Sequence, residues 1–267
     1  MKLLSHLTLI PLTVFGLLAA SAEAQTLIWN PAIVTNSGGS GAASVSGNTV
    51  NLSLTNGTDI NNSYVRIGTS STYEELNFTS PDSDGIRISA HDISFDGTAG
   101  AANRILYFTV TNTPSTLPYS IATGISLEIR GDGSFRLGWR ENYSGSGGWL
   151  SREKSTLLSS AAANPNIRYK GFDLVLTEHT YQLFLTTTTN VVQEYSGAFD
   201  YNTNWGDIGV NFVLQKAQAG TTTLSASIGD FSVSQIPEPS SMAVIAFGGI
   251  MLGASFYRKR KSIVKTD

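Results

Sequence analysis

Residues 125–139 have the sequence ISLEIRGDGSFRLGW, which predicts a β-hairpin. Apolar residues alternate with polar ones on both sides of Gly131-Asp132-Gly133. This period of two is typical of strands that bury one face, and the two glycines suit a tight connection between them. We therefore expect an antiparallel hairpin whose two arms place their apolar side chains on the same face.

The same alternation recurs along most of segment 25–236 and predicts an all-β protein. Further alternating or dense apolar runs lie at 50–54, 86–88, 93–95, 104–110, 172–176, 181–185, 208–214, 224–228 and 231–233. The connections are rich in Gly, Asn, Asp and Ser, which favours an antiparallel β-sandwich or jelly roll in one domain. Segments 41–47 and 144–148 are predicted to be flexible loops, and segment 151–163 a loop or short helix.

Charge and cysteine content exclude several classes of function. Six of the 17 Lys and Arg residues and three of the 20 Asp and Glu residues lie outside segment 25–236. That segment therefore carries 11 basic and 17 acidic residues, a net charge of −6, which disfavours nucleic acid as a partner. The chain has no cysteine, so disulfides, thiolate zinc sites and cysteine nucleophiles are excluded.

The first 24 residues are predicted to be a secretory signal peptide. A short positive start at Lys2 precedes an apolar run, and Ala22 and Ala24 supply small residues for cleavage after Ala24. The alternative is a transmembrane helix, but Pro11 and Gly16 interrupt the run.

The last residues of the chain predict a membrane span. Residues 240–257 contain no charge, and as a helix they would be roughly 27 Å long, enough for a thin bilayer. Arg258, Lys259, Arg260 and Lys261 follow directly, which places tail 258–267 in the cytoplasm and the preceding domain outside.

The order of motif, span and basic end resembles the PEP-CTERM sorting signal of Gram-negative bacteria. Pro237, Glu238 and Pro239 match the motif, and the resemblance covers roughly residues 236–262. It implies recognition by exosortase, a membrane protease that would cut near the motif and release the domain to the cell surface or extracellular matrix. The two prolines hold an extended segment that cannot join the helix. The alternative is an ordinary single-pass anchor, in which the tail is retained.

The strand order also resembles concanavalin A-like, laminin-G-type jelly rolls. The residues that carry this resemblance are the run 135–140, the second hairpin at 172–185 and the closing strand at 228–233. It implies two antiparallel sheets with one concave face, and binding of carbohydrate or protein.

Two groups of residues are candidate ligand sites. Asp82 and Asp84, ahead of Gly85, could bind calcium, although Asp before Gly is also common in turns. Trp139, Tyr143 and Trp149 surround a glycine-rich stretch and could stack on sugars. The alternative is that Trp139 belongs to the core and the other two cover a loop.

No catalytic motif is found in the sequence. Glu74 and Glu75 would point to opposite faces of a strand, and the same holds for His91 and His179 with their acidic neighbours. We expect both histidines to be solvated turn residues. No Gly-x-Ser-x-Gly sequence is present. We expect a non-catalytic binding or structural protein without a cofactor. A carbohydrate-binding adhesin that contacts exopolysaccharide is the first alternative, and a polysaccharide-acting enzyme of the same fold is the second.

Overall fold

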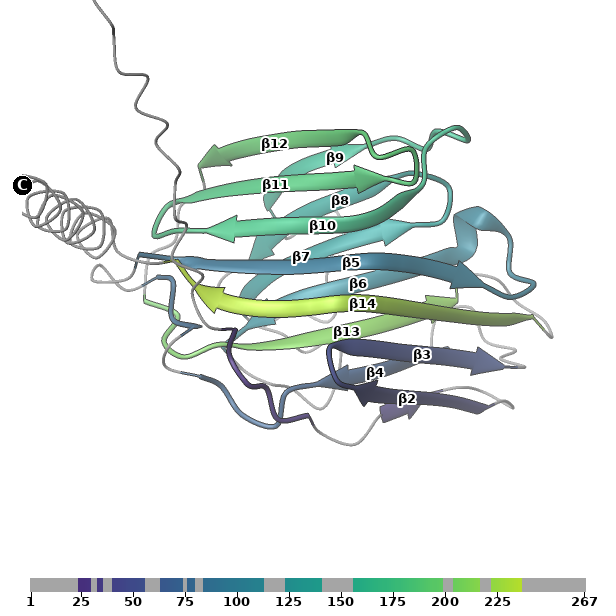
Figure 1. The fold of residues 1–267 in the computed structure, drawn as a ribbon, viewed down its shortest axis with the longest axis horizontal. Helices are drawn as coiled ribbons and strands as arrows, with labels where there is room; N and C mark the ends of the chain where they lie inside the picture. The colour runs from purple at the N-terminus through teal and green to yellow at the C-terminus, as the bar shows by residue number, and fades with distance from the viewer. Residues whose placement is uncertain are drawn as a thin grey trace, which may run out of the picture. The chain divides into compact units, whose positions relative to one another are not determined.

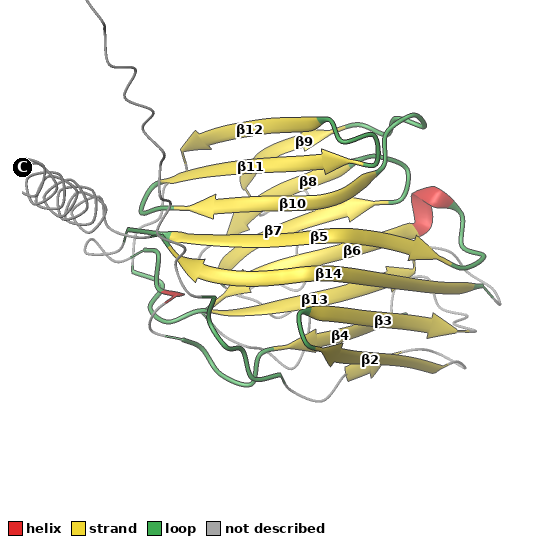
Figure 2. Ribbon diagram, in the orientation of Figure 1, coloured by secondary structure: helices red, strands yellow, loops and turns green. Residues whose placement is uncertain are grey.

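Two seven-stranded sheets pack face to face in the computed structural model. The structure describes residues 24–29, 33–35, 40–55, 63–73, 76–79, 84–112, 123–140, 156–198, 204–216 and 222–236. We call the sheet nearer the viewer in Figure 1 the front sheet and the other the back sheet. Among the described residues no α-helix occurs, and the short helical turn in Figure 2 that follows β5 is Ala101–Asn103.

The front sheet has the strand order β12-β11-β10-β5-β14-β3-β2. The bounds are Val192–Ala198 for β12, Thr180–Thr187 for β11, Tyr169–Leu176 for β10, Ile86–Asp96 for β5, Thr223–Gln235 for β14, Thr49–Thr55 for β3 and Ser40–Ser46 for β2. Every pairing within it is antiparallel.

The back sheet has the strand order β1-β4-β13-β6-β7-β8-β9. The bounds are Ile33–Thr35 for β1, Tyr64–Gly68 for β4, Gly209–Lys216 for β13, Arg104–Thr111 for β6, Gly124–Arg130 for β7, Phe135–Arg140 for β8 and Thr156–Ala161 for β9. Its pairings are also antiparallel, so the expected all-β antiparallel sandwich is confirmed.

Both predicted hairpins are confirmed. In the first, Leu127 pairs with Leu137 and Ile129 with Phe135, and all four side chains are buried in the core. Asp132 holds the turn, because its Oδ1 accepts hydrogen bonds from the backbone N–H and the hydroxyl of Ser134. Gly133 has a φ of +82°, which explains why a glycine ends this turn. The second hairpin is formed by β10 and β11.

Phenylalanine rings join the two sheets at the centre of the core. Phe108 on β6 and Phe212 on β13 come from the back sheet, and Phe172 on β10 and Phe231 on β14 from the front sheet. The ring centroids of Phe212 and Phe231 are 4.8 Å apart, and those of Phe108 and Phe172 are 5.3 Å apart. Burial of each such ring stabilises the fold by about 1.5–3 kcal/mol, so this contact is a main link between the layers.

Two local predictions are wrong. Segment 41–47 was expected to be a flexible loop, but Ser40–Ser46 forms β2 and pairs with β3 along its whole length. Segment 151–163 was expected to be a loop or short helix, but Thr156–Ala161 forms β9. Both are edge strands, and β2 consists mainly of small residues, so neither shows the apolar alternation of a half-buried strand.

Segment Ala22–Ile236 is one compact unit by its own contacts, and it contains the core cluster formed by the described residues. It therefore has what a domain needs to fold without its flanking segments. The signal peptide 1–24 lies outside the described residues except for Ala24, and sorting signal 237–267 lies outside them entirely, so both stay predictions. Within the described part of the chain, no helix has the length and apolar character needed to span a membrane.

Candidate functional site

The outer face of the back sheet carries a row of small and polar residues that crosses five strands. The strand registers place Asn211 opposite Gly68 and Thr109, Thr109 opposite Ser126, and Ser126 opposite Gly138. Two of the five positions are glycines, and the other three carry short amide or hydroxyl side chains. The row therefore forms a low polar floor on this face.

This floor is shielded from solvent. Asn211 is 1% exposed, and Thr109 and Ser126 are also buried. Outward-facing positions of an antiparallel sandwich are ordinarily solvated, which makes buried polar side chains there informative. A buried polar group needs a hydrogen-bond partner, so each partner on this floor has to be identified.

The hydroxyl groups of the floor have partners within the sheet. The hydroxyl of Ser126 donates to the carbonyl oxygen of Phe108 at 3.3 Å and lies 3.4 Å from the hydroxyl of Thr109. These contacts are long for hydroxyl hydrogen bonds, but they give both hydroxyls a partner on the neighbouring strands β6 and β7.

Arg66 and Asn211 form a pair at one end of the floor. They are diagonal neighbours on β4 and β13, since Asn211 pairs with Gly68 and Arg66 with Val213. Nη2 of Arg66 donates a hydrogen bond of 2.7 Å to Oδ1 of Asn211. Gly68 makes room for this bond, because a Cβ atom there would lie 1.9 Å from Oδ1 of Asn211 and 3.3 Å from Nη2 of Arg66.

The Arg66–Asn211 pair has unused donors. Arg66 is 4% exposed, yet its Nη1 has no hydrogen-bond partner among the described residues, and neither does Nδ2 of Asn211. Neither of the ion pairs in the described part of the chain includes Arg66. Burial lowers the pKa of Arg66, and the neighbouring Tyr64 partly offsets this effect. The pair thus combines a desolvated positive charge with N–H groups available to an acceptor.

A second charged pair lies on the same face, farther across the sheet. Glu128 on β7 is 1% exposed and forms an ion pair with Arg130, whose Nε donates to Oε1 of Glu128. Burial disfavours the charged form of Arg130, but the carboxylate of Glu128 outweighs burial and raises the pKa of Arg130. Glu128 is therefore already neutralised, in contrast to Arg66.

The described strands of the back sheet supply no pair of carboxylates. Glu128 is the single acidic residue in the seven strands, whereas a glycosidase of the usual kind needs two carboxyl groups on one face. What these strands offer is hydrogen-bond donors and a positive charge, which suit binding of an acceptor-rich ligand.

Trp139 packs inward from β8. It contacts the core cluster, and its ring centroid lies 6.3 Å from that of the buried Trp205, which in turn meets Phe78 edge-on at 5.4 Å. Trp139 therefore has the core position that was expected as the alternative to stacking on a sugar. Tyr143 and Trp149 lie outside the described residues, so contact of the three aromatic residues with a ligand stays a prediction.

Asp84 is half-buried and Asp82 lies outside the described residues. Gly85, which follows Asp84, has a φ of +101°, and a Cβ atom there would lie 2.3 Å from the carbonyl oxygen of Leu176. Gly85 thus occupies a position that requires glycine. In the described part of the chain no three His, Asp or Glu residues are grouped to hold a metal ion, and calcium binding by Asp82 and Asp84 stays a prediction.

The two histidines of the domain occupy different surroundings. His179 is exposed next to Glu178, at the turn between β10 and β11, as expected for a solvated turn residue. His91 was also expected in a turn, but it is half-buried within β5, opposite Gly229. That expectation was wrong because 86–88 and 93–95 form one continuous strand with a bulge, where Asp92 has a φ of 52°.

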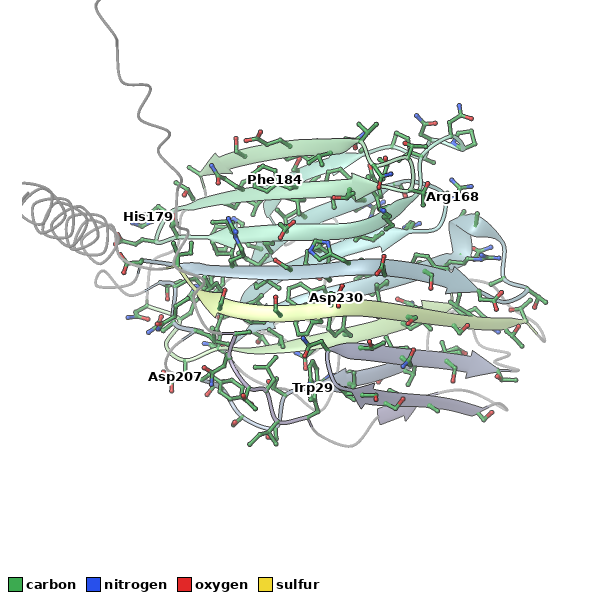
Figure 3. The ribbon with its side chains drawn as sticks, in the orientation of Figure 1. Trp29, Arg168, His179, Phe184, Asp207 and Asp230 are labelled. Atoms are coloured by element: carbon green, nitrogen blue, oxygen red, sulfur yellow. The ribbon has the colours of Figure 1, made fainter. Side chains whose placement is uncertain are left out.

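The outer face of the front sheet has a shallow groove of about 330 Å³. Small side chains from β2, β3, β14 and β5 line it, among them Ser53, Asn51, Ser225 and Ser227. Figure 3 shows Phe184 and Asp230 elsewhere on this face, on β11 and β14. No buried charge lies in the groove, so it offers less to a specific ligand than the back sheet does.

The site and the two layers define an antiparallel β-sandwich with a polar outer face. The sequence matches no protein-family model and no curated protein.

Similar solved structures include lectins. Peanut lectin with a 9-residue peptide is 11% identical, with a TM-score of 0.45 over 80% of this chain and 100% of the lectin chain. The metal-free lectin I-B4 of Griffonia simplicifolia is 12% identical, with a TM-score of 0.47 over 76% of this chain and 92% of the lectin. A family 7 alginate lyase with bound substrate is 10% identical, with a TM-score of 0.42 over 79% and 94%. These likenesses concern the fold and assign no ligand to this chain.

Arg66 and Asn211 were not among the residues selected from the sequence. The sequence signal that could have indicated them is local. Each is a polar residue between apolar neighbours in a short strand, at YVRIG and GVNFVL. The alternation places both side chains on the outer face, but the two residues are 145 positions apart, so their pairing follows only from the strand order.

Proposed function

We propose that the chain is an exported, non-catalytic β-sandwich that binds glycans on the outer face of the back sheet. The observation that carries this proposal is the Arg66–Asn211 pair, which keeps unused N–H donors beside a floor of glycines and short polar side chains. Glycans present many hydroxyl and ring oxygens that accept hydrogen bonds. Fixed donors beside short polar side chains can orient such a ligand.

Export is part of the same proposal. The signal peptide 1–24 directs the chain out of the cytoplasm, and helix 240–257 with its basic end holds it in the membrane until exosortase acts near Pro237-Glu238-Pro239. The net charge of −6 for segment 25–236 is suited to an extracellular domain and keeps it away from nucleic acids. The released sandwich then resides at the cell surface or in the extracellular matrix, where polysaccharides are abundant.

Glycan binding is tested with the isolated segment 25–236. Binding to a panel of neutral and acidic polysaccharides is measured by calorimetry, with calcium and with a chelator. We expect saturable binding that Gly138→Leu weakens, because a leucine side chain would rise from the floor. Absence of binding to every polymer would contradict the glycan function, and loss of binding in chelator would make Asp82 and Asp84 candidate calcium ligands.

Sorting is tested separately in a Gram-negative host that produces exosortase. The chain with Pro237, Glu238 and Pro239 all changed to alanine is expected to remain in the membrane fraction at full length. The unchanged chain is expected to lose its tail, as shown by mass spectrometry of its C-terminal peptide. Identical processing of both chains would contradict recognition of this motif.

A further inference from the structure

We infer that the ligand of the Arg66–Asn211 pair is a carboxylate group, as carried by the uronic acid residues of an acidic polysaccharide, and that the local charge of Arg66 binds it at contact distance despite the net charge of −6 on segment 25–236. This inference rests on the glycan-binding function proposed above and names the class of glycan. The first step is charge. Arg66 is always protonated in proteins, and among the described residues no carboxylate neutralises it. A buried cation without a counter-charge costs several kcal/mol, which a bound anion would offset.

The second step is the arrangement of donors. Nη2 of Arg66 is held by Oδ1 of Asn211, which ties the guanidinium and the amide into one connected unit. The atoms left without partners, Nη1 of Arg66 and Nδ2 of Asn211, are both N–H donors and neither is an acceptor. A group that only accepts hydrogen bonds fits them. An ionised carboxylate is such a group, and its two oxygens can take one donor each.

The third step is the environment. With exposed fractions of 4% for Arg66 and 1% for Asn211, an anion at this position would be held away from bulk water. Charge-assisted hydrogen bonds are strengthened in such surroundings. The carboxylate of Glu128 lies on the same face, but it forms an ion pair with Arg130 and therefore does not neutralise Arg66. Gly68 supports the geometry, since any larger residue would displace the Asn211 amide.

The decisive variant is Asn211→Asp. It replaces the amide by a carboxylate at the same position, so the protein itself supplies the counter-charge to Arg66 and repels an incoming anion. We expect segment 25–236 with this change to fold, with a melting temperature equal to or above that of the unchanged segment. A fold-preserving change that removes anion binding separates a ligand role from a structural role of the pair.

The probes are polygalacturonate and the same polymer after chemical reduction of its carboxyl groups. We expect the unchanged segment to bind polygalacturonate at least about tenfold more tightly than the reduced polymer, the difference that one or two charged hydrogen bonds make. Asn211→Asp should reduce affinity for polygalacturonate to that for the reduced polymer and leave the latter unchanged. Arg66→Gln provides a second variant with the same expected loss, should Asn211→Asp fail to fold.

The outcomes distinguish this inference from the proposed function. Equal affinity for the two polymers, or full binding of polygalacturonate by folded Asn211→Asp, would overturn the carboxylate site and leave glycan binding intact. Absence of binding to both polymers and to the whole panel would overturn the two together.

Discussion

The outer faces of the two sheets differ in what they carry and in how they meet solvent. The front sheet presents small polar residues such as Asn51 and Ser94 to water, and its groove is shallow. The back sheet carries Arg66, Asn211 and Glu128 on its outer face, and all three are buried. Alternation alone would assign both faces to solvent, since each lies on the side of its sheet opposite the core.

The two faces differ in how much their polar side chains contribute to stability. Substitution of a solvated serine or asparagine changes the free energy of unfolding little, because water can replace its hydrogen-bond partners. A buried arginine or glutamate is costly unless something neutralises it. Glu128 has such a partner in Arg130, whereas the described residues provide no counter-charge for Arg66, so the two buried charges of one face differ in whether they are neutralised.

Gly68→Ala is expected to have the largest effect on stability. The new Cβ atom would overlap Oδ1 of Asn211, so the buried amide must move and its hydrogen bond to Arg66 is lost. We expect a decrease of about 2–3 kcal/mol in the free energy of unfolding, measured by urea denaturation.

Gly229→Ala on the outer face of the front sheet is the matched control. Its Cβ atom would lie 3.3 Å from Cβ of Asp92 and 3.4 Å from the carbonyl oxygen of His91, which small shifts accommodate. We expect a change below about 1 kcal/mol. Equal effects of the two glycine substitutions would remove the distinction between the faces.

Glu128→Ala is expected to have the next largest effect. It leaves Arg130 without its counter-charge, but the side chain of Arg130 is 26% exposed and can turn partly to water. We therefore expect a loss of about 2 kcal/mol in the free energy of unfolding, less than for a fully buried pair.

Asp173→Ala on the front sheet is the control for Glu128→Ala. Asp173 is half-buried and accepts a hydrogen bond from Ser89, so its loss should cost about 1 kcal/mol or less.

Tyr169 lies in the interior between the sheets, so the effect of Tyr169→Phe on stability can be compared with the effects of substitutions on the two outer faces. Burial, with a smaller contribution from Tyr195, raises the pKa of Tyr169 to about 12, and its hydroxyl donates to Gln193 at 3.0 Å. The folded-state pKa lies above the unfolded value of about 10, so this stabilisation is complete below about pH 10 and is lost as the pH rises towards 12.

The variant Tyr169→Phe should lose about 1 kcal/mol at neutral pH. It should also show a smaller decline in stability between about pH 10 and 12 than the unchanged segment. Tyr195→Phe, which removes a similar hydrogen bond to Gln193, is expected to keep most of the alkaline decline, because burial is the larger cause of the raised pKa of Tyr169. Equal alkaline curves for all three proteins would show that Tyr169 does not cause it.

Ser227→Tyr is expected to have the smallest effect. It fills the groove on the front sheet with a side chain that suits a strand, and we expect stability to change by less than about 0.5 kcal/mol. Binding of polysaccharide should be unchanged in the same assay. A loss of binding would move the ligand site to the front sheet and reverse the comparison between the faces.

The strands that could be predicted from the sequence are those with one face in the core. β7, β8, β10 and β11 each alternate apolar and polar residues, and their hairpin partners follow within a few residues. β1, β2, β4, β9 and β12 were missed. β4 is a short strand that is buried at every position, and the other four are edge strands. An edge strand is exposed along one side and buries little apolar surface, so its sequence lacks the period of two.

The candidate site was less predictable than the fold. Among the residues selected from the sequence, Trp139 is packed against the core and Asp84 precedes a glycine with a positive φ. The Arg66–Asn211 pair was missed because no local motif marks it. A single arginine inside a strand is usually a solvated residue, and only its burial distinguishes this one.

The sequence by itself determined the class of structure, through its period of two, its glycine turns such as Gly133, and a lack of cysteine that leaves a large core as the source of stability. Tertiary structure alone decided that β13 lies between β4 and β6, which places Asn211 beside Arg66. The physical reason is that backbone hydrogen bonds join strands of any sequence, so strand order depends on packing of the whole core rather than on local residues.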